Sequence, residues 1–199
     1  MNQPLFDKAL ENYQDSKYSM ALFSIHEYLN SNPDDKPGRL LLGMIYGELS
    51  NYKRSFKILK EIQPLVTDNK TFHRLYYLQM GDNNRKIGKL NLAIEFYDKY
   101  IEVNPNSTNG YVFKGACFAL KGEYVLAKEQ HFIATKLKGH PEEAFYNLAL
   151  INRAEMNFEE AKEYCEKSLK IDPKDKNVKH CLIDILETIE LKKTVANSK

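Results

Sequence analysis

The sequence of 199 residues has no long apolar run, no excess of charge of one sign and no strand-like alternation. The longest apolar stretch, Leu40 to Tyr46, is far shorter than the roughly 18 residues that a membrane-spanning helix needs. We therefore expect no membrane insertion. The 29 Lys and Arg residues against 27 Asp and Glu leave a net charge of +2, without the basic block typical of nucleic-acid-binding proteins. We expect no nucleic acid as a partner.

Cysteine is scarce, and the three cysteines are far apart. Cys117, Cys165 and Cys181 are odd in number, which favours reduced thiols in the cytoplasm over a disulfide framework. The first residues, MNQPLFDKALENY, have neither the basic segment nor the apolar core of a secretory signal. With 43% hydrophobic and 28% charged residues, the chain is expected to fold, and we predict a cytoplasmic protein.

Sequence signatures of catalysis and metal binding are also missing. There is no HExxH, no glycine-rich phosphate loop and no GxSxG. Cys165, His180 and Cys181 could approach one another, but a structural zinc site requires four closely spaced ligands. The acidic pair Glu142-Glu143 is expected at a helix start, where it complements the helix dipole. We therefore predict no enzymatic activity, no metal site and no cofactor.

The sequence does contain an internal repeat. It is clearest in Glu142–Pro173, where two amphipathic helical patterns are separated by a break near Asn157 and end at a proline. Three series share the spacings 34, 38, 34 and 34: Ala21, Ser55, Ala93, Ala127 and Ala161; Ala9, Gly43, Gly81, Gly115 and Ala149; and Tyr18, Tyr52, Leu90, Tyr124 and Phe158. Small residues let two helices cross closely. This repetition indicates a stacked helical array.

The repeated hairpin resembles the tetratricopeptide repeat, a family of 34-residue helix pairs with aromatic, small and proline residues at fixed places. The fourth and fifth copies carry the matching residues Tyr111, Gly115, Phe118, Gly122, Tyr124, Ala127 and Ala134, and Phe145, Leu148, Ala149, Phe158, Ala161 and Pro173. The resemblance covers residues 2–175. It implies an all-α fold, a right-handed superhelix of stacked antiparallel hairpins (an α-solenoid), and says little about activity.

We expect a single array over residues 1–199. Its predicted parts are repeats at 2–35, 36–73, 74–107, 108–141 and 142–175, a capping helix at 176–191 and a frayed tail at 192–199. The capping helix is expected because the last repeat must cover its apolar face. These parts predict eleven helices and no strand.

The four extra residues of the second repeat fall between Pro64 and His73. Four residues make about one helical turn. Either the next helix is one turn longer at its start, where Thr67 or Asp68 can cap it, or the loop is longer.

The resemblance implies that the first helices of the hairpins line a concave wall that binds a partner. We predict that seven residues of these helices lie closest to a peptide or helical segment of another protein: Tyr13, Met44, Leu78, Val112, Phe113, Tyr146 and Asn147. The alternative is that they pack between neighbouring hairpins, since a helix in a tight array can bury more than one face.

The chemistry of the expected partner follows from one departure. Some family members hold a C-terminal carboxylate with lysine, asparagine and arginine, but here Phe6, Leu10 and Leu78 stand at matching places. An apolar partner segment is therefore favoured. We predict a protein–protein interaction module: a scaffold, adaptor or chaperone. The alternatives are a structural or regulatory subunit of a larger assembly and a dedicated chaperone for secreted proteins.

Overall fold

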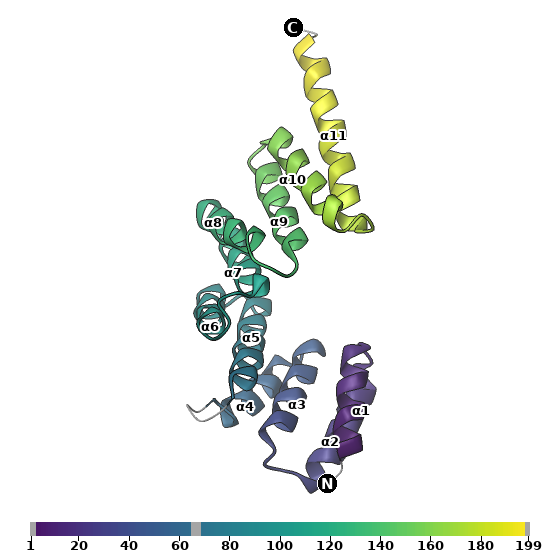
Figure 1. The fold of residues 1–199 in the computed structure, drawn as a ribbon, viewed down its shortest axis with the longest axis vertical. Coiled ribbons are helices and arrows are strands. Elements are labelled where there is room, and N and C mark those ends of the chain that lie inside the picture. The colour runs from purple at the N-terminus through teal and green to yellow at the C-terminus, as the bar shows by residue number, and fades with distance from the viewer. Residues whose placement is uncertain (1–2, 65–68, 198–199) are drawn as a thin grey trace. The chain divides into compact units, whose positions relative to one another are not determined.

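Helices make up all the regular structure in residues 3–64 and 69–197, the parts of the chain that the computed structural model describes. These residues form eleven helices and no strand, which confirms the predicted all-α fold. The helices are α1 (Gln3–Gln14), α2 (Tyr18–Ser31), α3 (Lys36–Glu48), α4 (Tyr52–Glu61), α5 (Lys70–Lys86), α6 (Leu90–Val103), α7 (Thr108–Leu120), α8 (Tyr124–Thr135), α9 (Pro141–Ala154), α10 (Phe158–Ile171) and α11 (Lys176–Asn197) (Figure 1).

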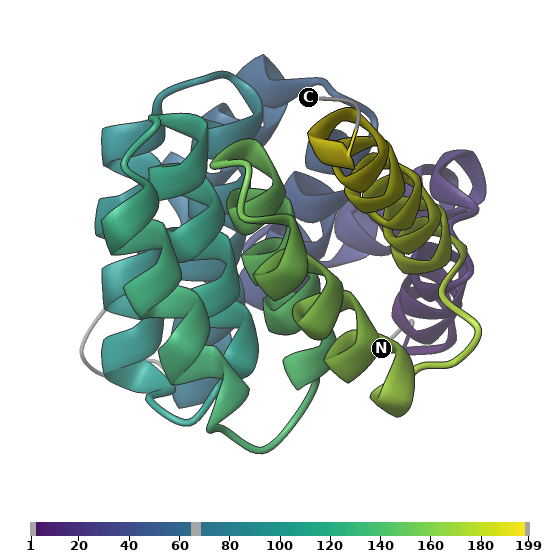
Figure 2. The same cartoon turned by 90° about the horizontal axis from the view of Figure 1, so that it is seen from above.

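The chain divides into two compact units. Unit 1 runs from the N-terminus to Val103 and holds three hairpins, α1–α2, α3–α4 and α5–α6. Unit 2 begins at Asn104 and holds two hairpins, α7–α8 and α9–α10, followed by the single helix α11, drawn in yellow in Figures 1 and 2. The prediction of one continuous array with the stated repeat boundaries stays a prediction.

The turn inside each hairpin has the same geometry. At equivalent places, one residue has a positive φ between 56° and 77°: Ser16, Ser50, Gly88, Gly122 and Met156. The N–H of the following residue donates to a carbonyl five residues back, as from Asn157 to Asn152 at 2.8 Å. This is the Schellman arrangement, which satisfies carbonyls at the end of the first helix. The second helix then begins at the predicted Tyr, Leu or Phe position.

The two helices of a hairpin approach closely because a small residue on the first faces a larger one on the second. A Cβ on Gly81 would lie 2.5 Å from the Tyr97 ring, and one on Gly115 would lie 2.7 Å from the His131 ring. The facing residues form a fourth recurring series, all with no exposed surface: Ile25, Leu59, Tyr97, His131 and Cys165. The array therefore keeps a fully buried side chain opposite a small residue at each crossing, and not one residue type.

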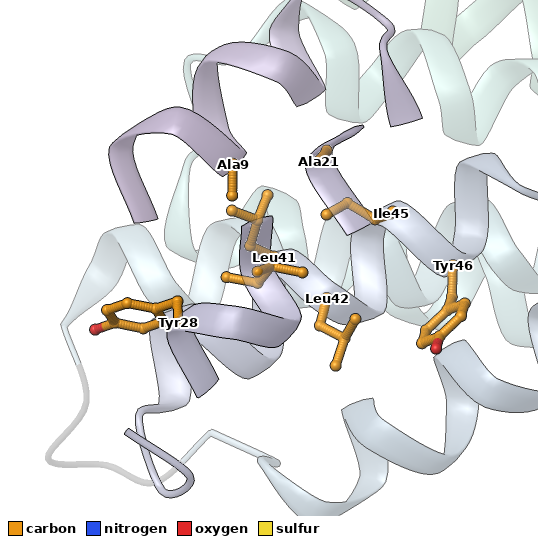
Figure 3. Packing of buried hydrophobic residues seen from close by; sticks show 8 residues of the cluster. Ala9, Ala21, Tyr28, Leu41, Leu42, Ile45 and Tyr46 are labelled. Atoms are coloured by element: carbon orange, nitrogen blue, oxygen red, sulfur yellow. The ribbon is translucent and has the colours of Figure 1, made fainter. Parts of the chain in front are cut away.

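Each hairpin then packs on the next helix of the chain, largely through its second helix. In unit 1 the cluster around Ala9, Ala21 and Ile25 extends to Leu41 and Ile45 of α3 (Figure 3). In unit 2 a second cluster joins α9 and α10 to Val178, Cys181, Ile185 and Ile189 of α11. Each helix buries a stripe of apolar residues against its own partner and the next hairpin.

A buried chain of polar groups joins α3, α4 and α5. The Ser55 hydroxyl donates to the Gly43 carbonyl at 2.6 Å, and the Asn83 amide donates to the Ser55 hydroxyl at 2.7 Å. The Gln79 amide donates to the Asn83 carbonyl oxygen at 2.9 Å. These three side chains are at most 5% exposed. Ser55 stands where the other hairpins have alanine, and its hydroxyl links the second hairpin to the third.

Two helices are longer than the repeat requires, and the first of them is α5. It has 17 residues, against 12 to 14 in the other first helices of hairpins. Its start is capped by Asn69, whose side chain accepts the Phe72 N–H at 2.8 Å. The expected caps Thr67 and Asp68 lie outside the described residues. Of the two alternatives for the insertion, the longer helix is the one observed.

Helix α11 continues to Asn197, through residues that were predicted to form a frayed tail. No proline or glycine interrupts Lys192–Asn197, and the Lys192 ammonium lies 5.4 Å from the centre of the Phe158 ring of α10. The absence of a helix breaker and this contact let the helix continue beyond the residues needed to cover the last hairpin.

Candidate functional site

The first helices of unit 1 enclose an apolar pocket of about 510 Å³. The pocket lies entirely within unit 1 and uses α1, α3 and the start of α5. Its lining residues are Phe6, Leu10, Tyr13, Gln14, Pro37, Leu40, Leu41, Met44, Asn69, Thr71, Phe72 and Leu75. None of the twelve carries a charge. A concave, mostly apolar site of this size is in the range that buries a bound group.

Two of the seven predicted binding residues meet in this pocket. Tyr13 from α1 and Met44 from α3 are both half-buried and both line it. Burial and the nearby Glu48 carboxylate raise the pKa of the Tyr13 phenol to about 12. The phenol is therefore protonated at neutral pH and can donate or accept a hydrogen bond at the pocket edge.

Beyond the pocket, the C-terminal ends of α3 and α5 are polar. The Lys86 ammonium lies 3.5 Å from Glu48, and the Arg85 guanidinium lies 3.2 Å from Asp82. The Tyr97 hydroxyl also donates to Asp82, at 2.9 Å. The charges of Asp82, Arg85 and Lys86 at this end of α5 are therefore paired.

Val112 is a correction to the predicted site. It is 1% exposed and packs with Ala134 of α8 and Ala144 of α9. Its side chain therefore belongs to the core of unit 2 and offers no surface to a partner. The sequence suggested a wall residue because Val112 is apolar and on a first helix, but such a helix packs on two neighbours at once.

The other four predicted residues are half-buried. Leu78 lies on α5 and does not line the pocket, and Phe113 packs against the Val112 cluster. Tyr146 packs against the cluster that α9 shares with α10 and α11. Asn147 lies beside it on α9. These four residues stay a prediction, because partial burial is compatible both with packing and with partner contact.

Sequence reasoning missed the residues that close the pocket. Asn69, Thr71 and Phe72 come from the first turn of α5 and its cap, which the insertion supplies. The signal was present, because an apolar residue follows a capping asparagine within the insertion. The insertion predicts a longer helix, but it does not indicate which surface the longer helix exposes.

The reactive side chains are arranged as core groups. Cys165 and Cys181 are buried free thiols in one cluster between α10 and α11. Burial, followed by the neighbouring Cys181, raises the pKa of the Cys165 thiol to about 12, so the thiol is protonated and weakly nucleophilic. His180 of the same helix is exposed.

Of the histidines in the described residues, His131 in α8 is the one with no exposed surface. Neither of its ring nitrogens has a hydrogen-bond partner among those residues. Burial lowers its pKa to about 4, so the ring is neutral at pH 7.

Neither a metal cluster nor a membrane span is found in the described part of the chain. Within residues 3–64 and 69–197, no group of three or more His, Cys, Asp or Glu side chains could hold a metal ion. In the same residues, every helix is too short or too polar to cross a bilayer.

Comparisons with known proteins identify the repeat. Tetratricopeptide repeat family models match residues 76–107 and 142–175. The human protein O-mannosyl-transferase TMTC1 is 27% identical over 124 residues, which cover 62% of this chain and only 14% of that protein. The chain thus spans a small part of that relative's length.

Two solved structures share the fold. TTC0263, a tetratricopeptide repeat protein of Thermus thermophilus, superposes with a TM-score of 0.72 and 20% identity over 94% of this chain and 99% of that one. YrrB, described as a tetratricopeptide repeat protein with an unusual peptide-binding site, gives 0.61 and 21% over 89% of each chain. The two matched models identify residues 76–107 and 142–175 as tetratricopeptide repeats, and the structural likenesses show that the chain has the fold of tetratricopeptide repeat proteins.

Proposed function

We propose that this protein is a non-enzymatic scaffold or adaptor that binds a segment of another protein on the first helices of its hairpins. The observation that carries the proposal is the uncharged apolar pocket of unit 1, which Tyr13 and Met44 line. Exposed apolar concavities on folded proteins are typical of binding sites. YrrB, a structural neighbour, is described as having a peptide-binding site.

The energetic requirement is modest. Each large apolar side chain removed from water contributes about 1.5–3 kcal/mol when fully buried. Association costs several kcal/mol in lost freedom, and micromolar affinity corresponds to about 8 kcal/mol. Three or four apolar contacts in the pocket, with a few hydrogen bonds at its edge, would supply this.

Site-specific photo-crosslinking in cells tests the proposal. A photoreactive phenylalanine analogue at Leu10, which is 37% exposed in the pocket, should capture a partner. The same analogue at Glu163, exposed on α10, is the matched control and should capture little. Equal capture from both positions would place binding elsewhere.

The residues of unit 2 are tested separately. Replacing Tyr146 and Asn147 together by alanine should weaken binding of the captured partner if the binding surface includes α9. Replacing Glu163 or Lys167 of α10 should do little. The melting temperature of each variant must be measured as well, because Tyr146 packs against α11.

A second candidate, a subunit of a larger assembly, is favoured by one observation on α8. Four large apolar side chains there are 40–72% exposed on its outer face: Val125, Leu126, Phe132 and Ile133. The outer face of α10 is charged instead, with Lys162–Glu166 and Lys167–Glu163 pairs. An exposed apolar face without a pocket suits a large partner more than a short segment. Crosslinking from the Phe132 position with none from Leu10 would support this candidate.

The cytoplasm is the compartment we propose, because all three cysteines are buried thiols outside any disulfide, of the kind that reducing compartments preserve. The activity named for the human relative belongs to a protein of which this chain matches 14%. We propose that this chain contributes binding and not transfer chemistry.

A further inference from the structure

The extra turn of α5 has no counterpart in the other hairpins. By the 38-residue spacing, the start of α3 at Lys36 corresponds to Arg74, so Lys70–His73 are additional residues at the start of α5. Helix α7 begins at Thr108, which again corresponds to Arg74 by the 34-residue spacing. The four residues therefore add surface without belonging to the stacked repeat.

This turn is anchored. The Asn69 side chain caps it through the Phe72 N–H. Phe72 is 6% exposed, its ring stacks with Tyr76 at 6.4 Å between centroids, and the Lys36 ammonium lies 5.9 Å from its ring centre. The turn is thus held in place before any partner binds, which lowers the ordering cost of binding.

The pocket needs this turn for its third wall. Asn69, Thr71 and Phe72 line it together with residues of α1 and α3. In a hairpin without the insertion, α5 would begin at the equivalent of Arg74, and Leu75 alone would remain on that side. The pocket is therefore a property of this chain's insertion, additional to the repeat.

The lining selects a helical occupant over an extended one. Nine of the twelve lining residues are apolar or aromatic, and the three others, Gln14, Asn69 and Thr71, are neutral. The Asn69 side chain is already engaged by the cap. An extended segment would place backbone N–H and C=O groups against hydrocarbon without partners, which is costly, whereas a helix satisfies its own backbone.

Charge at the α5 border of the pocket indicates which helix fits. Lys70 and Arg74 are exposed and flank the lining residues Thr71 and Phe72 in the chain. Neither forms an ion pair among the described residues within 4.0 Å. Acidic side chains beside the apolar stripe of a partner helix would be complementary to this border.

We propose that the pocket of unit 1 binds the apolar face of an acidic amphipathic helix from a partner protein, with the extra turn of α5 as its third wall. The proposal rests on the proposed function and deepens it. It names the class of partner segment and the residues that select it.

Selection from a phage-displayed library of random peptides tests it. Peptides of about 16 residues are long enough for four helical turns. The full chain should enrich sequences with large apolar residues three and four apart and with Asp or Glu beside them. A proline placed at the centre of an enriched peptide should abolish binding, because it breaks the helix. Enrichment of sequences that tolerate the central proline, or enrichment of none, would overturn the proposal.

Paired variants locate the site. Leu10→Glu places a charge in the pocket and Thr71→Trp fills it, so each should weaken the enriched peptides by at least about tenfold. Phe23→Glu, at an apolar residue that is 68% exposed on α2, makes the same kind of change outside the pocket and should leave the affinity unchanged. Equal loss in Leu10→Glu and Phe23→Glu would contradict the placement.

Charge reversal tests the border. A Lys70→Glu/Arg74→Glu chain should lose the acidic peptides and enrich basic ones, whereas Lys57→Glu/Lys60→Glu on α4, with the same change in net charge, should not. Failure of these arms with continued crosslinking from Leu10 would reject the acidic helix and leave the proposed function standing. Loss of that crosslinking would reject both.

Discussion

The crossing of the third hairpin, in unit 1, and that of the fourth, in unit 2, fill the same position in two ways. Opposite Gly81 stands Tyr97, whose hydroxyl donates to Asp82 at 2.9 Å and receives the Arg85 Nε–H at 3.3 Å. Opposite Gly115 stands His131, with no partner for either ring nitrogen among the described residues. Both rings are fully buried. The repeat thus specifies a buried side chain opposite a small residue, whereas the energy of each crossing depends on whether the polar atoms of that side chain are satisfied.

Acid should distinguish the two crossings most strongly. The pKa of His131 is lowered from 6.5 to about 4 in the folded chain, so the unfolded chain binds more protons below pH 6.5. The stability that the neutral His131 ring contributes is therefore fully present above pH 6.5. As the pH falls toward 4, the free energy of unfolding decreases by about 3 kcal/mol on account of this residue. Hydrogen exchange should show α7 and α8 losing protection over this interval. In a His131→Leu chain, the free energy of unfolding should not show this decrease between pH 6.5 and 4.

Adding a methyl group at the glycine that faces each buried ring should have the next largest effect on stability. Gly81→Ala places a methyl group 2.5 Å from the Tyr97 ring, which its hydrogen bonds hold in place, so we expect a loss of about 2 kcal/mol. Gly115→Ala meets the His131 ring at 2.7 Å with no bonds to break, so its loss should be smaller. Denaturant unfolding of both variants measures the difference. A larger loss for Gly115→Ala would contradict the comparison.

Removing the polar atoms should change stability in opposite directions. Tyr97→Phe deletes a hydroxyl with two partners and should cost about 1 kcal/mol. His131→Leu deletes two unsatisfied nitrogens from a buried site at similar volume and should stabilise the chain by about 1 kcal/mol. Thermal melts at pH 7 would show one midpoint falling and the other rising. Two midpoints that shift the same way would mean that the His131 nitrogens are satisfied in solution.

The smallest effect concerns the turns. Met156 has φ of 63°, where its equivalents Gly88 and Gly122 are glycine. Because a side chain in this left-handed region costs about 1 kcal/mol, partly offset by the greater chain entropy of glycine, Met156→Gly should stabilise the chain by about 0.5 kcal/mol. Gly122→Ala should destabilise it by a similar amount. Denaturant unfolding of both variants measures the two changes in stability. Changes of the same sign would argue against strain at Met156.

Local features of the fold followed from the sequence. The recurring Tyr, Leu or Phe begins the second helix of every hairpin. This start could be predicted because it depends on the residues of the turn before it, and not on contacts with neighbouring hairpins. The small residues at the crossings were found from their period, but their partners were not. The buried residues opposite them include aliphatic, aromatic and thiol side chains, so a series defined by burial stays hidden in a search for residue type.

The site was harder to predict for a related reason. Tyr13 and Met44 line the pocket, but Val112, with the same pattern, is buried by Ala134 and Ala144. The repeat period predicts which face of its helix a residue lies on. Whether that residue is exposed depends on which side chains of the next hairpin pack against it. The buried link from Ser55 to Asn83 joins residues 28 apart, and nothing in either local pattern indicates it.

That link has a consequence for how the chain avoids errors while folding. Hairpins built on one period are near-copies, and a growing chain could stack the wrong pair, since their apolar faces are similar. Ser55 bonds Gly43 within its own hairpin and Gln79 bonds Asn83 within α5, but the bond from the Asn83 amide to the Ser55 hydroxyl forms only when α4 lies against α5. A mispaired hairpin would leave the buried Asn83 amide without this bond, at a cost of about 1–3 kcal/mol. This hydrogen bond therefore favours the correct pairing of the second and third hairpins over a mispaired stack.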